Sequence, residues 1–207
     1  YMERIGLYGG TFAPPHLGHV HAAKVFLATV SLDRLLIMPA GIPPHKTKTA
    51  GDTPEERLAM CRAAFGNLPH TEISDYEIRK PGKSYTVETL EALAAPEREI
   101  TMLCGTDMFL TLDTWHRAPD IFRLCTVACM ARDNDAGERI RMTAERYRSD
   151  YGAGIVLLPG EPLVLSSSEI REGLRSGTDM RAYLPSGVWK ICRREGLYQS
   201  ENCGNAE

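Results

Sequence analysis

The fold is decided by the stretch Gly9-Gly10-Thr11-Phe12-Ala13-Pro14-Pro15-His16-Leu17-Gly18-His19, near the amino terminus. It follows a short apolar segment at residues 5–8 and leads into a segment of helical periodicity at residues 19–30. A strand, a glycine-rich turn and a helix start together form a place where the backbone can approach a phosphate, because the helix N-terminus presents free N–H groups. His16 and His19 lie three residues apart at this helix start, so both imidazoles can face the same anion. The stretch therefore predicts a phosphate-binding loop.

Outward from this loop, apolar strand-like segments alternate with helical ones. We expect strands at residues 5–8, 35–39, 73–78, 100–104, 126–131 and 155–158. We expect helices at residues 19–30, 54–68, 87–95 and 136–148, with an irregular helical stretch over 107–124. Thr53, Pro54 and Glu56 have the spacing of a capping box at the start of the second helix. The alternation predicts an α/β fold, a Rossmann-like doubly wound parallel sheet in a single domain over residues 2–200, followed by a flexible tail at 201–207.

Composition sets broader bounds on the class of protein. A chain of 207 residues with 43% hydrophobic content can bury a core of ordinary size, and its net charge of −3 argues against binding to a nucleic acid polymer. No segment reaches the ~18 apolar residues of a membrane span, and no charged-then-apolar leader opens the chain. The six cysteines show no zinc-like spacing, so we expect reduced thiols, with Cys125 and Cys129 on the same face of a strand. These features indicate a cytoplasmic protein and are compatible with a homo-oligomer.

A second motif, Leu165-Ser166-Ser167-Ser168-Glu169-Ile170-Arg171, indicates another anion site. Ser166 and Glu169 have capping-box spacing, so a helix is expected to begin here. Hydroxyl groups, backbone N–H groups and an arginine in the first turn can together hold a phosphate. Taken alone, the motif is more typical of a serine-capped helix with a surface arginine.

Together the two motifs resemble those of the nucleotidyltransferase superfamily, whose signature is histidine or threonine, any residue, then Gly-His. The eleven-residue stretch is most similar to the nicotinate-nucleotide adenylyltransferase family, with Ala13 in place of an aspartate that the family often has. Residues 165–171 are similar to that family's Ile-Ser-Ser-Thr-x-Ile-Arg motif. The resemblance implies that His16, His19 and Arg171 are catalytic. It also implies that ATP is bound by Gly9, Gly10, Thr11, Phe12, His16, Gly18, His19, Gly105, Asp107, Ser167, Ser168 and Arg171.

Three further segments bear on the family's second substrate, nicotinate mononucleotide. Lys46 follows two prolines after the second expected strand, a pattern typical of a surface loop, but the resemblance places it near the substrate phosphate. Thr86 lies at a hydroxyl-capped helix start, and the resemblance places it at the pyridine carboxylate. Asp107 either caps the next helix or binds ribose hydroxyls. Trp115 either packs in the core or, as in the family, stacks on the pyridine ring, with His116 beside it.

The resemblance implies transfer of AMP from ATP to nicotinate mononucleotide, with Mg²⁺ carried mainly by the nucleotide and no metal held by the protein. A tight turn with histidines as metal ligands is the alternative, but His16, His19 and His21 are scattered around a helix rather than set at a zinc spacing. Phosphopantetheine adenylyltransferase is a second candidate, disfavoured by the Pro-Pro-His-Lys and Thr-Trp-His-Arg segments. A fragment of a class I aminoacyl-tRNA synthetase is a third candidate, but these 207 residues leave no room for that enzyme's other domains. A non-catalytic nucleotide sensor on the same fold stays open.

Overall fold

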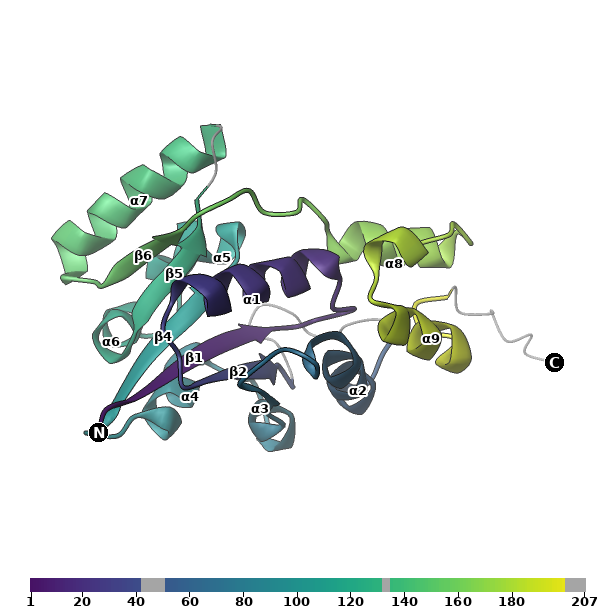
Figure 1. Ribbon diagram of the computed structural model, residues 1–207, viewed down its shortest axis with the longest axis horizontal. Coiled ribbons are helices and arrows are strands. Elements are labelled where there is room, and N and C mark those ends of the chain that lie inside the picture. The colour runs from purple at the N-terminus through teal and green to yellow at the C-terminus, as the bar shows by residue number, and fades with distance from the viewer. Residues whose placement is uncertain (42–50, 132–134, 200–207) are drawn as a thin grey trace.

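The structure is a computed structural model that describes residues 1–41, 51–131 and 135–199 (Figure 1). Within these residues the strands are β1 (Glu3–Gly10), β2 (Arg34–Pro39), β3 (Thr71–Ile73), β4 (Arg98–Cys104), β5 (Thr126–Met130) and β6 (Ile155–Leu158). The helices are α1 (Leu17–Thr29), α2 (Pro54–Phe65), α3 (Tyr76–Arg79), α4 (Thr86–Leu93), α5 (Thr106–Thr111), the 3₁₀ turn η1 (Leu112–Thr114), α6 (Ala118–Leu124), α7 (Asp135–Tyr151), α8 (Ser167–Arg175), the 3₁₀ turn η2 (Arg181–Tyr183) and α9 (Ser186–Glu195).

The six strands form one parallel sheet in the order β3-β2-β1-β4-β5-β6. Leu7 of β1 pairs with Leu36 of β2 on one side and with Met102 of β4 on the other. The strand order reverses between β1 and β4, so the chain leaves their carboxyl ends towards opposite faces of the sheet, with α1 on one face and α5 on the other. Such a topological switch point is where sheets of this kind bind ligands. The predicted doubly wound α/β fold in a single domain is confirmed.

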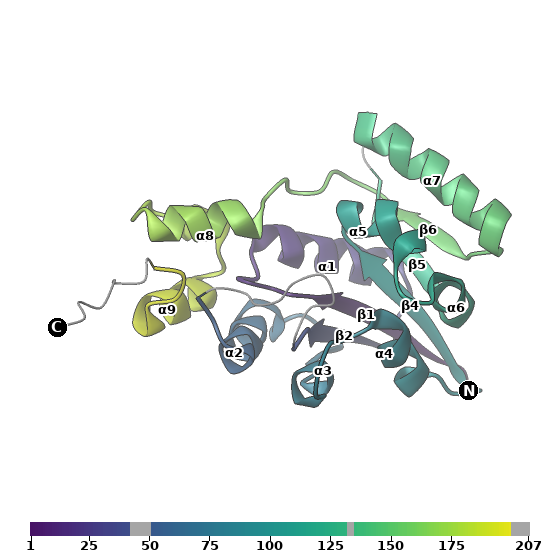
Figure 2. The same cartoon turned by 180° about the vertical axis from the view of Figure 1, so that it is seen from behind.

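Helices cover both faces of the sheet (Figures 1 and 2). Successive side chains of each strand point to opposite faces. Ile5 and Leu7 enter a core with α4, α5, α6 and α7, whereas Tyr8 enters a core with α1 and α2. Both cores are fully enclosed at their centres: Phe26 of α1 and Phe109 of α5 are each 0% exposed. Burial on both faces accounts for the almost continuous apolar runs that the strands show in the sequence.

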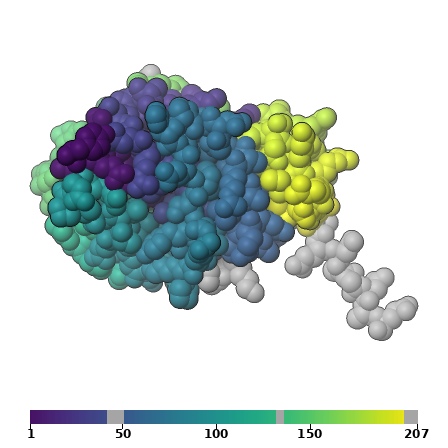
Figure 3. All heavy atoms as spheres, turned by 60° about the horizontal axis from the view of Figure 1, so that its bottom comes forward, coloured from purple at the N-terminus to yellow at the C-terminus, as the bar shows by residue number. Residues whose placement is uncertain are grey.

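A third apolar cluster joins the C-terminal helices to the loop that follows β1. It contains Met60 of α2, Ile170 of α8, Val188 and Cys192 of α9, and Ala13 of the loop. The C-terminal segment, yellow in Figure 3, therefore packs at one end of the molecule against the segment that contains α2. This packing brings residues 165–171 to the loop of residues 9–19, more than a hundred residues earlier in the chain.

One expected strand was wrong in its bounds, and one helix was missed. The strand expected at residues 73–78 ends at Ile73, and Tyr76–Arg79 form the short helix α3. The chain turns because the Ser74 hydroxyl accepts the Tyr76 N–H at 3.3 Å and the Asp75 carbonyl accepts the Arg79 N–H at 2.9 Å. Helix α9 was not anticipated, although α8 begins where the Ser166 cap predicted it.

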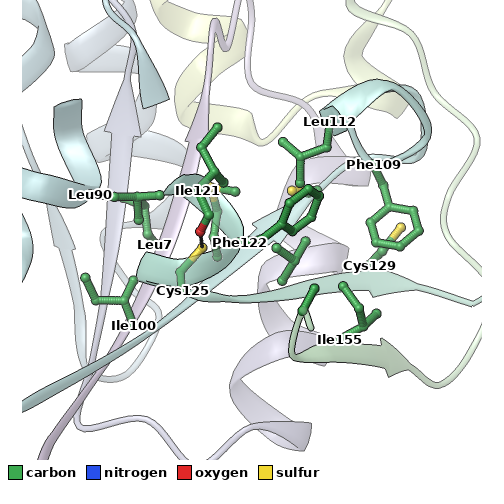
Figure 4. Close-up of a cluster of buried hydrophobic side chains, with 14 of the residues drawn as sticks. Leu7, Leu90, Ile100, Phe109, Leu112, Ile121, Phe122, Cys125, Cys129 and Ile155 are labelled. Atoms are coloured by element: carbon green, nitrogen blue, oxygen red, sulfur yellow. Dashed lines mark hydrogen bonds between the residues drawn. The ribbon is translucent and has the colours of Figure 1, made fainter. Parts of the chain in front are cut away.

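Cys125 does not belong to the strand expected to carry it. It is the C-cap of α6, and its thiol donates to the Ile121 carbonyl at 3.3 Å, as drawn in Figure 4. Cys129 lies on β5, and both sulfur atoms enter the same apolar core, so the two side chains do share a side of the sheet. The five cysteines of the described segments are buried and form no disulfide there: Cys61, Cys104, Cys125, Cys129 and Cys192.

Two expectations fall outside the described residues. Lys46 lies in segment 42–50, and the tail expected at 201–207 lies in the final eight residues. None of the helices in the described residues is long and apolar enough to cross a membrane.

Candidate active site

Two adjoining cavities lie at the carboxyl ends of β1 and β4, on either side of the switch point. The larger, of about 460 Å³, is lined by both loop histidines together with Gly18, Gly105, Asp107 and Ser167. The smaller, of about 160 Å³, is lined by Gly9, Gly10, Thr11, Thr86 and Trp115. Met108 of α5 lines both, so the cavities meet at that side chain. Their combined form suits two ligands held end to end.

The two histidines form a stacked pair whose protonation is set by the backbone. The Gly18 N–H donates to His16 Nδ1 at 3.1 Å, and the His16 N–H donates to His19 Nδ1 at 3.0 Å. The rings lie 3.7 Å apart between centroids, at an interplanar angle of 21°. A ring nitrogen that accepts a hydrogen bond carries no proton, so each neutral ring holds its proton on Nε2. Each imidazole therefore presents an Nε2–H donor.

Burial keeps both rings neutral. Desolvation lowers the pKa of His16 to about 4, and it lowers the pKa of His19 well below its ordinary value, with the neighbouring His16 adding to the effect. At neutral pH the pair therefore donates hydrogen bonds without carrying a full charge.

The helix start offers different donors from those that the sequence suggested. The Gly18 N–H is used by the His16 ring, and the His19 N–H donates to the His16 carbonyl at 3.1 Å, so these two amides are not free. Both histidines line the larger cavity. They accept from the backbone through Nδ1 and offer Nε2–H to a ligand.

Gly18 and Phe12 hold this pair in place. A Cβ atom at Gly18 would lie 2.9 Å from His16 Cε1 and 3.0 Å from the Leu163 carbonyl oxygen, so any larger residue would displace the ring or the backbone. Phe12 is buried, with its ring edge-on to His19 at 5.1 Å between centroids. Phe12 lines neither cavity, and its backbone adopts a left-handed φ of 51°.

The second motif is bonded directly to the first loop. The Ser167 hydroxyl donates to the Pro14 carbonyl at 3.0 Å, and Arg171 donates to the Ala13 carbonyl at 2.7 Å and to the Ser168 hydroxyl at 3.1 Å. Ser167 also lines the larger cavity, whereas Ser168 and Arg171 do not. The structure thus brings both predicted phosphate motifs together, with the arginine fixed by the backbone of the residue that replaces the family's aspartate.

The smaller cavity contains an acidic group that sequence reasoning missed. Glu77 of α3 is 8% exposed, and its Oε1 accepts the Thr89 hydroxyl at 2.6 Å. Burial raises the pKa of Glu77 above its ordinary value, against the lowering effects of Thr89 and Lys80. Ser84 also lines this cavity, and its buried Oγ has no hydrogen-bond partner among the described residues. No motif pointed to Glu77, because the pattern of residues 73–78 predicts a strand.

The remaining predicted residues divide between the cavity walls and their surroundings. Trp115 is half-buried, lines the smaller cavity and packs against the core. His116 lines neither cavity, and its ring lies 4.6 Å from that of Tyr85, next to Thr86. His21, the third histidine of the loop region, lies with Nε2 3.0 Å from the Glu161 carbonyl. Arg139 of α7 lines the larger cavity and was not anticipated.

The donor set of the larger cavity suits a magnesium ion brought by a nucleotide. Asp107 is its one carboxylate among the described lining residues, and the described chain has no group of three or more candidate metal ligands. Mg²⁺ commonly keeps several waters and binds through one or two carboxylates together with substrate phosphates. The cavity therefore fits a metal that the ligand itself largely coordinates.

A doubly wound sheet with paired imidazoles in a switch-point cavity defines a nucleotide-binding α/β protein, and residues 7–173 match the family model described as cytidylyltransferase-like. A probable nicotinate-nucleotide adenylyltransferase of Clostridium botulinum is 33% identical over 97% of this chain and all of its own length. One of a Synechococcus strain is 37% identical over 95% of both chains. The chain therefore belongs to the nicotinate-nucleotide adenylyltransferase family.

A solved structure with the same fold is that of the nicotinic acid mononucleotide adenylyltransferase of Plasmodium falciparum, complexed with NaAD. It has a TM-score of 0.74 at 15% identity, covering 95% of this chain and 97% of that one. At this identity the likeness concerns the fold alone.

Proposed function

We propose that this protein transfers AMP from ATP to nicotinate mononucleotide, forming nicotinate adenine dinucleotide and pyrophosphate in the synthesis of NAD. The observation that carries the proposal is the pair of cavities joined at Met108. One holds the stacked histidines and Ser167, and the other holds Thr86 and Trp115. Family membership over almost the whole chain supports the same reaction.

In the proposed reaction a phosphate oxygen of nicotinate mononucleotide attacks the α-phosphorus of ATP. A new P–O bond forms, the bond between the α-phosphorus and the bridging oxygen breaks, and pyrophosphate leaves with the electron pair. The attacking oxygen is already ionised at neutral pH, so the step needs no general base. Catalysis then consists of aligning two anions and stabilising the charge that develops on the transferred phosphoryl group.

The histidine pair supplies the central donors. Both rings are neutral and protonated on Nε2, so they can donate to phosphate oxygens in the transition state without releasing a proton. The backbone N–H groups that donate to Nδ1 fix this tautomer before the substrate binds. Such preorganised donors need little rearrangement when charge develops.

The leaving pyrophosphate is assigned to the second motif. We assign Ser167 and Ser168 as donors to its oxygens and Arg171 as the cation that holds its charge. Because Arg171 also bonds to the Ala13 carbonyl, it joins the leaving-group end to the histidine loop. Gly105 and Asp107, at the start of α5, are assigned to the ribose of ATP.

The acceptor is assigned to the smaller cavity. Trp115 offers an aromatic face to the pyridine ring, and the Thr86 hydroxyl and N–H offer donors to its carboxylate, with His116 nearby. Lys46 is assigned to the acceptor phosphate. Mg²⁺, held by nucleotide oxygens and water, would neutralise phosphate charge when bound. The buried free thiols and the reaction itself favour a cytoplasmic location.

Label transfer tests this proposal. ATP labelled at the α-phosphorus should deliver its label to a dinucleotide when nicotinate mononucleotide is the acceptor, whereas label at the γ-phosphorus should appear in pyrophosphate. Label from the α position in free AMP, with no dinucleotide, would indicate hydrolysis and contradict the proposal.

A further inference from the structure

Arg57 bonds to two of the backbone segments that line the smaller cavity. It is on α2 and is 2% exposed, one of the largest fully buried side chains of the described structure. Its Nη1 donates to the Thr11 carbonyl at 3.0 Å and also to the Ala40 carbonyl, and its Nη2 donates to the Gly41 carbonyl at 2.9 Å. Thr11 follows β1, and Ala40 follows β2.

The charge of Arg57 is balanced by Asp52, and Tyr198, near the end of the described chain, bonds to that carboxylate. The Arg57 Nε donates to Asp52 Oδ1 at 3.0 Å, and the Asp52 side chain is 1% exposed. The Tyr198 hydroxyl donates to Asp52 Oδ2 at 2.5 Å, and the Tyr198 N–H donates to the Gly51 carbonyl at 3.3 Å. Tyr198, Asp52 and Arg57 thus form one buried chain of hydrogen bonds, named here the Arg57 network.

The residues at the end of the Arg57 network line the acceptor cavity and not the larger one. Thr11 and Ala40 belong to the wall of the smaller cavity, together with Thr86 and Trp115. Arg57 itself lines neither cavity. A buried guanidinium with donors in a fixed planar fork can hold several carbonyl groups at set positions, which a flexible ammonium cannot do.

We propose that Arg57 is a positioning residue for the acceptor, which sets the spacing of Thr11 and Ala40 and is itself held by Asp52 and Tyr198. The inference rests on the proposed function, because it takes the smaller cavity as the site of nicotinate mononucleotide. It makes the C-terminal Tyr198 part of the support for acceptor binding, although it is distant in sequence from every residue of that cavity.

The test compares Arg57→Lys and Tyr198→Phe with a matched control, Arg98→Lys. Arg98 likewise donates to a carboxylate, that of Glu3 at 2.9 Å, and to a carbonyl, that of Leu93 at 2.6 Å. It lies at the amino end of the sheet, away from both cavities. Arg57→Lys should raise KM for nicotinate mononucleotide about tenfold, since misplacement of binding groups by ~1 Å can cost up to ~10²-fold. Thr11, which the resemblance assigned to ATP, lines the smaller cavity and not the larger one, and none of the residues that line the larger cavity is bonded to Arg57. KM for ATP should therefore change by less than about twofold.

Tyr198→Phe should change the acceptor KM in the same direction by a smaller factor, since the Arg57 contacts to the carbonyls remain. Tyr198→Phe decides the matter alone if Arg57→Lys does not fold. Arg98→Lys should lower thermal stability without changing either KM. A purely structural role would lower the melting temperature of the Arg57 and Tyr198 variants and leave both KM values unchanged, and that result would overturn the proposal.

Hydrogen exchange provides a readout that does not depend on turnover. In Arg57→Lys, faster amide exchange should be confined to residues 9–13 and 38–41, and it should not occur there in Arg98→Lys. Uniform acceleration, or none, would contradict the positioning role. If the unmodified protein forms no dinucleotide, the proposed function fails, and the exchange result still decides whether Arg57 holds these two segments.

Discussion

Replacement of His19 by alanine should abolish most of the turnover while leaving ATP binding largely intact. The substitution removes the Nε2–H donor that the structure presets by bonding His19 Nδ1 to the His16 N–H at 3.0 Å. Loss of one preorganised donor typically costs ~10²–10³ in kcat, or about 2.7–4 kcal/mol. The His16 N–H also loses its acceptor, which destabilises the fold by about 1–3 kcal/mol if no water replaces it.

The assay is steady-state release of pyrophosphate, with KM for ATP measured beside kcat. His21→Ala is the matched control, because His21 lies on the same helix but bonds to the Glu161 carbonyl and should keep kcat within about twofold. Since the pKa of His16 is lowered to about 4, kcat should not fall as pH rises through 6.5, whereas imidazolium donors would require that fall. A His19→Ala variant that keeps more than half of the normal kcat would remove His19 from the mechanism.

Three further changes test other parts of the site. Arg171→Lys should raise KM for ATP about tenfold or more, because a lysine cannot bond to Ala13 and Ser168 in one plane. Hydrogen bonds of charged groups contribute about 1.5–3 kcal/mol each. Unchanged KM and kcat would show that Arg171 is a surface residue without a role in binding ATP. The kcat/KM for nicotinate mononucleotide should be about 10-fold to 100-fold higher than that for its amide, since an amide NH₂ facing the Thr86 donors leaves buried groups unpaired. Equal kcat/KM values would refute the assignment of the carboxylate to Thr86. Burial raises the pKa of Glu77 in the folded state, so ionisation of Glu77 lowers stability as pH rises above the pKa of the unfolded state. The free energy of unfolding of Glu77→Gln, relative to the unmodified protein, should therefore increase between pH 4 and 7. A relative free energy that decreases with pH would contradict this sign.

Much of the architecture could be predicted because its signals are local. Thr53 and Glu56 exchange the two hydrogen bonds of a capping box, at 3.2 and 2.8 Å, as their spacing indicated. The glycine-rich loop follows β1 and leads into α1, and Ser166 caps α8. Strand and helix periodicity in between was sufficient to predict a parallel, doubly wound sheet.

What could not be predicted depends on contacts between distant segments. Glu77 reaches its cavity because residues 74–79 form a turn and a short helix, which the alternation of apolar residues did not reveal. Arg57 looked like any polar residue of an amphipathic helix, yet it is buried by loops that follow two different strands. The tautomers of His16 and His19 depend on backbone N–H directions, which residue spacing does not specify.

The most direct test of the central claim measures which acceptor releases pyrophosphate from ATP. The purified protein would be given ATP, Mg²⁺ and, in separate reactions, nicotinate mononucleotide, nicotinamide mononucleotide, phosphopantetheine or no acceptor. We predict pyrophosphate and dinucleotide in equal amounts with nicotinate mononucleotide, and at most a slow reaction with its amide. Release with phosphopantetheine in place of nicotinate mononucleotide, or ATP binding without release for any acceptor, would contradict the account.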